Sequence, residues 1–184
     1  DADALANAAL DNTGGVKPAY GSVPAKAATR AGSLYLDDLH VGQRFTSGTY
    51  RMTEDRMKAF AAEFDPQPFH LDEAAARHSI FRGLAASGWH TAAVTMRLLV
   101  TGGLPIAGGL VGLGGETTWP RPTRPGDTLR VENEIVAISP SRSKPNQGIV
   151  TVRSNTINQD GDPVQVLTTK IIVFKRADNS ATPS

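Results

Sequence analysis

The chain has 184 residues, with 19 Lys and Arg against 18 Asp and Glu, which gives a formal net charge of +1. This length suits one domain with a substantial core, and the balanced charge with only 6% aromatic residues disfavours a nucleic-acid partner. The absence of cysteine excludes disulfides, thiolate metal sites and a cysteine nucleophile. No apolar run reaches membrane-span length. We therefore expect a soluble protein without a membrane partner, placed in the cytoplasm.

Residues 1–33 are rich in alanine, glycine and small polar residues, and they have few large apolar groups to bury. A short helix could form over residues 2–10, but the composition is typical of a tail or linker. The segment begins without Met and has no signal-type apolar stretch. We therefore predict an N-terminal tail over 1–33, a single domain over 34–176 and a C-terminal tail over 177–184.

The first predicted elements are a strand over residues 45–52, which alternate loosely between apolar and polar residues, and a helix directly after it. Thr53 is a suitable N-cap, with two acidic residues in the first turn. The helix should run to about Phe64, because Pro66 stops it. Its predicted buried face is made of Met57, Phe60, Ala61 and Phe64.

Two further helices are expected, a short one over residues 72–77 with Asp72 as its cap, and a long apolar one over 87–100. Apolar and small residues spread around much of the long helix, which predicts burial on more than one side. The run Thr101–Gly103, followed by Pro105, should end it.

The rest of the chain predicts strands over residues 110–118, 127–138, 148–158 and 164–175, joined by links that carry Pro, Gly, Asn and Asp. One buried helix followed by at least four meandering strands predicts an α+β domain, with an antiparallel sheet wrapped around the long helix.

The segment Asp65–Asp72 (DPQPFHLD) places a carboxylate and an imidazole five positions apart in a stretch with two prolines. Proline fixes its own φ and restricts the residue before it, so Asp65 and Gln67 are expected in extended geometry. A stiff segment suits an acid/base pair, because catalytic groups gain from being held at a fixed separation. The alternative is a turn in which Asp65 ends one helix and Asp72 begins the next.

With residues 83–90 (GLAASGWH), 124–129 (RPGDTL) and 141–145 (SRSKP), this segment resembles the MaoC-like hydratases/dehydratases. The resemblance covers roughly residues 34–176. The family pattern is Asp-x-Asn-Pro-x-His-x-Asp, and Asp65, Pro68, His70 and Asp72 stand in register with it.

The resemblance implies a hot-dog fold, an acyl-CoA substrate and a homodimer whose two sheets join into one. It implies (R)-specific hydration of trans-2-enoyl-CoA, or dehydration of a 3-hydroxyacyl-CoA, as in fatty acid metabolism. Asp65 and His70 would hold and activate one water. No cofactor is expected, since the CoA thioester is the substrate.

Substrate contacts are expected from Gln67, Ser87, Gly88 and Trp89. Free N–H groups at the start of the long helix could bind the thioester oxygen, with Gly88 as the candidate donor. The family has Asn at the position of Gln67, and often His at the position of Ser87. Ser87 could cap the helix, contact substrate, or do both.

Other polar and aromatic residues carry weaker signals. His90 is expected in the core, and the four histidines lack metal-ligand spacing. Trp89 and Trp119 are expected to pack, and in the alternative interpretation Trp89 lines an acyl pocket. Basic residues over 141–144, with Arg121 and Arg124, are candidates for contacts with CoA phosphates but fit a solvated loop better.

Two other functions stay open. A thioesterase would usually need a carboxylate on the long helix, and residues 87–100 contain none. A non-catalytic acyl-thioester-binding protein is the second, and it would gain support if Asp65 and His70 pointed into separate environments.

Overall fold

The computed structural model describes residues 32–177. Ordered along the chain, its elements are η1 (Leu36–Asp38), β1 (Arg44–Thr46), β2 (Tyr50–Arg51), α2 (Glu54–Phe64), α3 (Pro68–Leu71), α4 (Glu73–Arg77), α5 (Gly88–Leu98), the π-helical turn η2 (Leu99–Gly103), β3 (Val111–Thr118), β4 (Thr128–Pro140), β5 (Gln147–Ile157) and β6 (Pro163–Phe174). The predicted tails lie largely outside the described residues, so their extents stay predictions.

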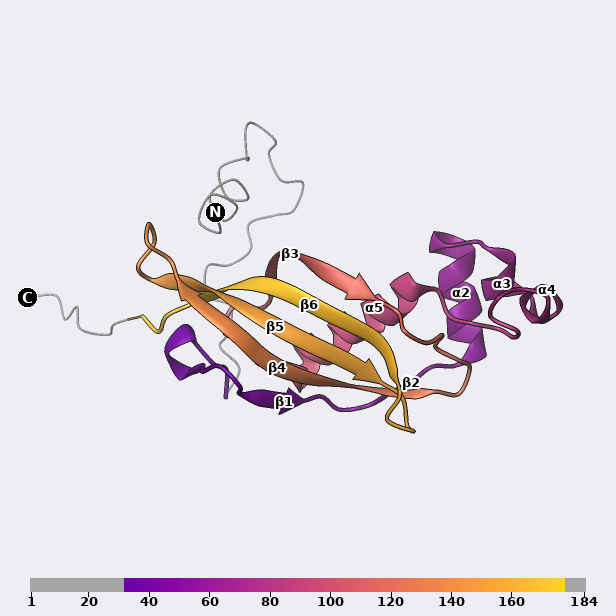
Figure 1. Cartoon of the computed structure of the whole chain (residues 1–184), viewed down its shortest axis with the longest axis horizontal. Helices are drawn as coiled ribbons and strands as arrows, with labels where there is room; N and C mark the ends of the chain where they lie inside the picture. The colour runs from indigo at the N-terminus through magenta and orange to yellow at the C-terminus, as the bar shows by residue number, and fades with distance from the viewer. Residues whose placement is uncertain (1–31, 178–184) are drawn as a thin grey trace, which may run out of the picture.

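The strands form one antiparallel sheet in the order β1-β4-β5-β6-β3, with β2 paired to β4. Figure 1 shows α5 lying across one face of this sheet, while α2, α3 and α4 gather at one end. The predicted α+β class and hot-dog fold are therefore confirmed.

The core lies between α5 and the inner face of the sheet. Alternate residues of the central strands point inward, so Val131 and Ile135 of β4 and Val150 and Val152 of β5 have no exposed surface. Val94 and Leu98 of α5 pack into the same cluster. Burying an aliphatic side chain of this size contributes about 1.5–3 kcal/mol, so this cluster fixes the position of α5 against the sheet.

The four long strands agree with the sequence prediction, but the single strand expected over residues 45–52 is wrong. It is divided into β1 and β2. At the break, the Ser47 hydroxyl accepts the Val131 N–H at 2.8 Å, and the Ser47 N–H donates to the Val131 carbonyl at 2.9 Å. A side-chain oxygen therefore replaces a backbone carbonyl as the acceptor of one hydrogen bond between the strands. Alternation of apolar and polar residues does not reveal this competition between side chain and backbone.

The two longer helices begin where the sequence predicts, but their burial differs from the prediction. Thr53 precedes α2 without a side-chain capping bond, and Phe64, expected on the buried face, is 64% exposed. In α5 only one stripe is buried, because Trp89 and Met96 are 63% and 46% exposed. The expectation that the long helix is buried on several sides is therefore wrong for the single chain.

The segment after α2 is not extended throughout. Gln67 keeps extended geometry, but Pro68 begins the helical turn α3, in which His70 is buried. Proline suits the first helical position, because the N–H that it lacks would have no acceptor there. Asp72 caps α4 as predicted, and its carboxylate accepts the Ala75 N–H at 2.7 Å.

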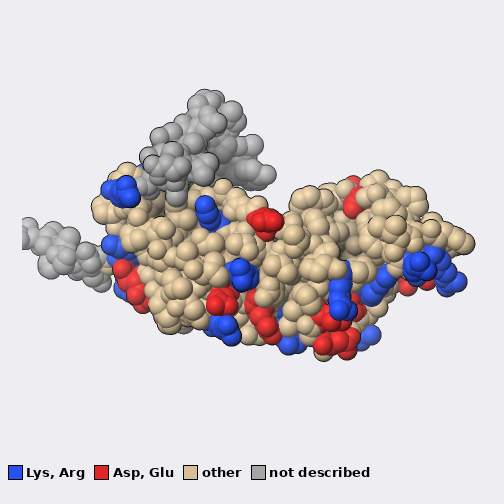
Figure 2. All heavy atoms as spheres, viewed as in Figure 1, with Lys and Arg blue, Asp and Glu red and all other residues tan. Residues whose placement is uncertain are grey.

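The surface carries mixed charge. Figure 2 shows basic and acidic side chains interspersed on the visible face, in keeping with the net charge of +1. Among the described helices, none has both the length and the apolar character needed to cross a bilayer.

Candidate active site

Asp65 and His70 converge at the helical end of the domain. The carboxylate follows the last turn of α2, the imidazole projects from α3, and 3.3 Å separates Asp65 Oδ2 from His70 Nε2. Their side chains are 17% and 6% exposed. The two groups therefore share one environment, as a water-activating pair requires.

The tautomer of His70 follows from its second nitrogen. Nδ1 lies 2.7 Å from the Ala85 carbonyl oxygen, and because a carbonyl only accepts hydrogen bonds, Nδ1 must carry a proton. In the neutral imidazole, Nε2 then has a free lone pair directed toward the Asp65 side. This orientation leaves Nε2 able to accept a proton from a bound water.

Asp65 is held as a carboxylate by two donors. Ser87 Oγ donates to Oδ2 at 2.7 Å, and Gln67 Nε2 donates to Oδ1 at 2.7 Å. Burial raises the pKa of Asp65, but these hydrogen bonds, together with the attraction of His70 when its ring is protonated, outweigh it, so the pKa lies below its usual value. Gln67, one methylene longer than the family's Asn, thus reaches the carboxylate.

Ser87 both supports Asp65 and caps α5. Its hydroxyl accepts the Trp89 N–H at 3.2 Å while donating to Asp65. The next residue, Gly88, lines the cavity beside the pair, and as the first residue of α5 its N–H has no intrahelical acceptor. The positive end of the helix dipole therefore faces this cavity.

The cavity has a volume of about 660 Å³, within the range of small-molecule sites. Its deep side is polar, because the buried hydroxyls of Thr91 and Thr123 meet at 3.0 Å. Its rim is apolar and exposed, with Ile80 90% and Trp89 63% accessible. The pair therefore lies in a pocket with an apolar rim and a hydrogen-bonding floor.

Trp89 and Trp119 meet edge to face at the rim, with ring centroids 5.6 Å apart. Trp119 Nε1 donates to the buried Gln165 side chain at 3.0 Å, which fixes the indole over the start of α5. A Cβ on Gly88 would lie 2.9 Å from that indole. Trp89 lines the cavity, as the alternative interpretation of this residue expected, and Trp119, which was expected only to pack, lines it as well.

His90 is confirmed as a core residue. It is 6% exposed and stacks on Phe60 at 4.6 Å, and it does not line the cavity. Burial lowers the pKa of His90, and the nearby Arg56 lowers it further.

The basic residues considered for CoA phosphates divide into two groups. Arg121 and Arg124 line the cavity, where Arg121 pairs with Asp162 at 2.9 Å and the Arg124 guanidinium donates to backbone carbonyls. The loop over residues 141–146 joins β4 to β5 at the end of the sheet opposite α3 and α4 (Figure 1). This loop therefore cannot reach the cavity of its own chain.

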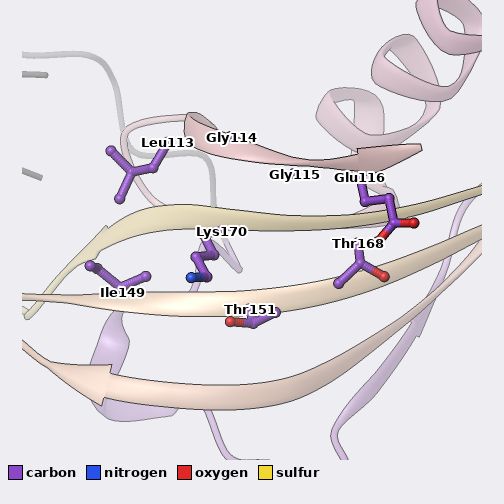
Figure 3. Close-up of a pocket in the computed structure, with 8 residues that line it drawn as sticks. All are labelled: Leu113, Gly114, Gly115, Glu116, Ile149, Thr151, Thr168 and Lys170. Carbon is purple, nitrogen blue, oxygen red and sulfur yellow. The ribbon is translucent and has the colours of Figure 1, made fainter. Parts of the chain in front are cut away.

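A second hollow, the outer groove, lies on the sheet face turned away from α5. It has a volume of about 370 Å³ and is lined by Leu113, Gly114, Gly115, Glu116, Ile149, Thr151, Thr168 and Lys170. Figure 3 shows these side chains rising from β3, β5 and β6, with Lys170 between the aliphatic end and Glu116. It contains no acid paired with an imidazole.

In the part of the chain that the structure describes, no three His, Asp or Glu side chains come close enough together to hold a metal ion. The functional residues that the sequence analysis missed are the Ala85 carbonyl and the Thr91–Thr123 floor. A backbone acceptor has no side-chain signature, and paired threonines on separate elements have none either.

The sequence matches the family described as MaoC like domain over residues 39–158. It is 35% identical over 130 residues to YdeM of Bacillus subtilis (strain 168), a protein described as uncharacterized, covering 68% of this chain and 89% of that one.

Solved structures agree with this match. The MaoC-like dehydratase from Rhodospirillum rubrum is 61% identical, with a TM-score of 0.78, covering 79% of this chain and 99% of that chain. The R-hydratase PhaJ1 from Pseudomonas aeruginosa is 28% identical, with a TM-score of 0.63, covering 83% and 95%.

Proposed function

This chain belongs to the family of MaoC-like domains, and we propose that it is a hydratase/dehydratase that adds water to a trans-2-enoyl-CoA with (R) stereochemistry, or removes it from a 3-hydroxyacyl-CoA. The observation that carries the proposal is the convergence of Asp65 Oδ2 and His70 Nε2, 3.3 Å apart beside the cavity. The R-hydratase and dehydratase relatives support the reaction class and its stereochemistry.

The acid/base chemistry follows from the tautomer of His70. A water held between the Asp65 carboxylate and His70 Nε2 loses one proton to Nε2 as its oxygen bonds to the β-carbon of the alkene. The imidazolium then returns that proton to the α-carbon, so the alkene gains one hydroxyl and one hydrogen. Asp65 orients the water and stabilises the imidazolium between these two steps.

Negative charge develops on the thioester oxygen as water adds. The Gly88 N–H and the N-terminal end of α5 lie at the cavity, where they would stabilise this charge. The apolar rim near Trp89 suits the acyl chain, whereas Gln67 and Ser87 act through Asp65 in the absence of substrate. Such a reaction needs no redox or group-carrying cofactor, so none is proposed.

The alternative functions have less support. A non-catalytic binder has no use for an imidazole fixed in one tautomer beside a carboxylate. A thioesterase lacks the carboxylate expected on α5, since Gly88–Leu98 contains no Asp or Glu.

We also propose that the chain acts as a homodimer. Among the described strands, β3 pairs only with β6 and forms one edge of the sheet. Val111 on that edge is 48% exposed, and the open side of α5 exposes Met96 at 46%. A second copy pairing through β3 would cover this edge and the apolar surface near it. Sedimentation should show a dimer at micromolar protein concentration, and a clean monomer would contradict the proposal.

The test is a panel of trans-2-enoyl-CoA thioesters of short, medium and long chain, followed by the loss of conjugated-thioester absorbance. Product stereochemistry is read with dehydrogenases specific for (R)- or (S)-3-hydroxyacyl-CoA. Turnover that requires both Asp65 and His70 and yields the (R) product is expected. Absence of turnover with every thioester, in either direction, would overturn the proposal.

A further inference from the structure

Arg124, in the link between β3 and β4, holds a distant loop through its side chain. Its Nη1 donates to the carbonyls of Gly83 at 2.7 Å and Leu84 at 3.0 Å, and its Nη2 donates to the carbonyl of Phe81 at 2.5 Å. One guanidinium therefore satisfies three backbone acceptors of a single loop. A planar fork of donors suits this task, whereas a lysine ammonium on a flexible stem does not.

The loop needs such support because its backbone is unusual. Arg82, between the clamped carbonyls, has φ of 54° and is the one non-glycine residue with positive φ among the described residues. This conformation is unfavourable for a residue with a Cβ and persists only where the surroundings enforce it. The hydrogen bonds of Arg124 on both sides of Arg82 provide that enforcement.

The residue that follows the loop carbonyls held by Arg124 orients the His70 imidazole. The Ala85 carbonyl, one residue beyond Leu84, accepts a hydrogen bond from His70 Nδ1–H, with 2.7 Å between nitrogen and oxygen. The following N–H, that of Ala86, donates to the Thr123 carbonyl at 2.9 Å. The link that carries Arg124 thus holds the loop on both sides of the Ala85 oxygen.

Arg124 is itself held in place. Its backbone N–H donates to Asp127 Oδ2 at 2.7 Å, and Asp127 is 7% exposed. Its guanidinium is committed to the loop carbonyls, so it is poorly placed to serve as a phosphate contact.

We propose that Arg124 is a positioning residue, which fixes the tautomer and orientation of His70 by holding the loop that presents the Ala85 carbonyl. Its kinetic consequence rests on the proposed hydratase function, but its effect on the imidazole does not. Without the guanidinium, the loop relaxes, the Ala85 oxygen moves away from Nδ1, and the neutral imidazole divides between its two tautomers.

The experiment compares wild type, Arg124→Ala and Arg124→Lys, with Arg44→Ala as the matched control, since Arg44 is an exposed arginine paired with Glu134 on the sheet. Nitrogen-15 spectra of the labelled histidines, at a pH where the imidazole is neutral, report the tautomer of His70. We expect the Nδ1–H form in wild type and Arg44→Ala, and a tautomer mixture in both Arg124 variants. Circular dichroism confirms folding in each case.

Kinetics provide the second measurement. In the Arg124 variants kcat should fall about tenfold or more with KM within about twofold. The base is misplaced, whereas Arg124 is one of many residues that line the cavity and its guanidinium is bonded to the loop. Folded Arg124 variants with an unchanged tautomer or an unchanged kcat would overturn the proposal. Failure of both variants to fold would also overturn it, by making Arg124 a determinant of the fold. If wild type shows no turnover, the proposed hydratase function fails. The nitrogen-15 spectra alone then decide whether Arg124 positions His70.

Discussion

The candidate active-site cavity and the outer groove are both hollows on the same small domain, but they are built differently. In the cavity, segments distant in sequence converge, since Ser87 donates to Asp65 and Ala85 accepts from His70. The outer groove is lined by three neighbouring strands, β3, β5 and β6, where the register partners Thr151 and Lys170 face outward. Space and apolar lining are therefore common to both, whereas converging, hydrogen-bonded polar groups belong only to the cavity.

The difference predicts the largest loss of activity at the pair itself. Asp65→Asn and His70→Ala should each lower kcat about 10³-fold. His70→Ala removes the group that accepts and returns the proton, and Asp65→Asn removes the charge that orients the water and stabilises the imidazolium. The matched controls are Asp55→Asn and His78→Ala, on the exposed surfaces of the same helical region. Steady-state kinetics on purified variants measure the effect. Wild-type turnover in Asp65→Asn or His70→Ala would contradict the assignment of Asp65 and His70 as the catalytic pair.

A methyl group at Gly88 should have the next largest effect. In Gly88→Ala the new Cβ would lie 2.9 Å from the Trp119 ring, which must shift away from the start of α5. We expect kcat/KM to fall about tenfold to a hundredfold, because the helix terminus and the rim no longer keep their geometry. Gly48→Ala is the control, since nothing lies within 4 Å of its added Cβ, and equal losses in both variants would contradict this account.

Ser87→Ala should lower kcat/KM roughly tenfold, because the Asp65 carboxylate loses a hydrogen bond. It should also lower the free energy of unfolding by about 1 kcal/mol through loss of the helix cap. The pKa of Asp65 should rise in this variant, as one of the donors that lower it is gone. Carbon-13 titration of the carboxyl measures the rise, and Ser87→Thr should restore the wild-type titration.

A smaller effect is expected in stability against pH. The folded pKa of Asp65 is lowered from 3.8, so its carboxylate contributes stability above about pH 4, which is lost as pH falls through the lowered pKa. Urea unfolding should therefore show a larger difference between wild type and Asp65→Asn at neutral pH than in acid. A difference that stays constant with pH would show that ionisation of Asp65 contributes nothing.

The smallest effect is expected in the outer groove. Lys170→Ala and Thr151→Val should change kcat/KM by less than about twofold, as is usual for surface changes away from a site. The same kinetic assay measures it. A large loss in either variant would erase the distinction between the two hollows.

The sequence predicted the parts of the fold that have a local signature. Alternation located β4, and turn residues in the links bounded β3, β5 and β6. Pro66 ended α2, and Ser87 and Asp72 marked helix starts. α3 was missed because a single helical turn, here Pro68–Leu71, is too short for periodicity to register. The break at Ser47 was missed because it depends on a hydroxyl competing with the backbone.

The same limit applies to the site. Asp65 and His70 could be identified because their spacing matches a family pattern. The support from Ala85 and Arg124 involves backbone carbonyls, which every residue has, so no residue type reveals it. Exposed tryptophans also contradict the usual burial of large rings, and only the position of the cavity explains them.

The edge-to-face tryptophan pair has a practical consequence. The chain contains two tryptophans, and both stand at the mouth of the cavity. A molecule bound in the cavity beside these rings would change the polarity around them. The intrinsic fluorescence of the native protein is thus a label-free optical probe of cavity occupancy, with no other indole to dilute its signal.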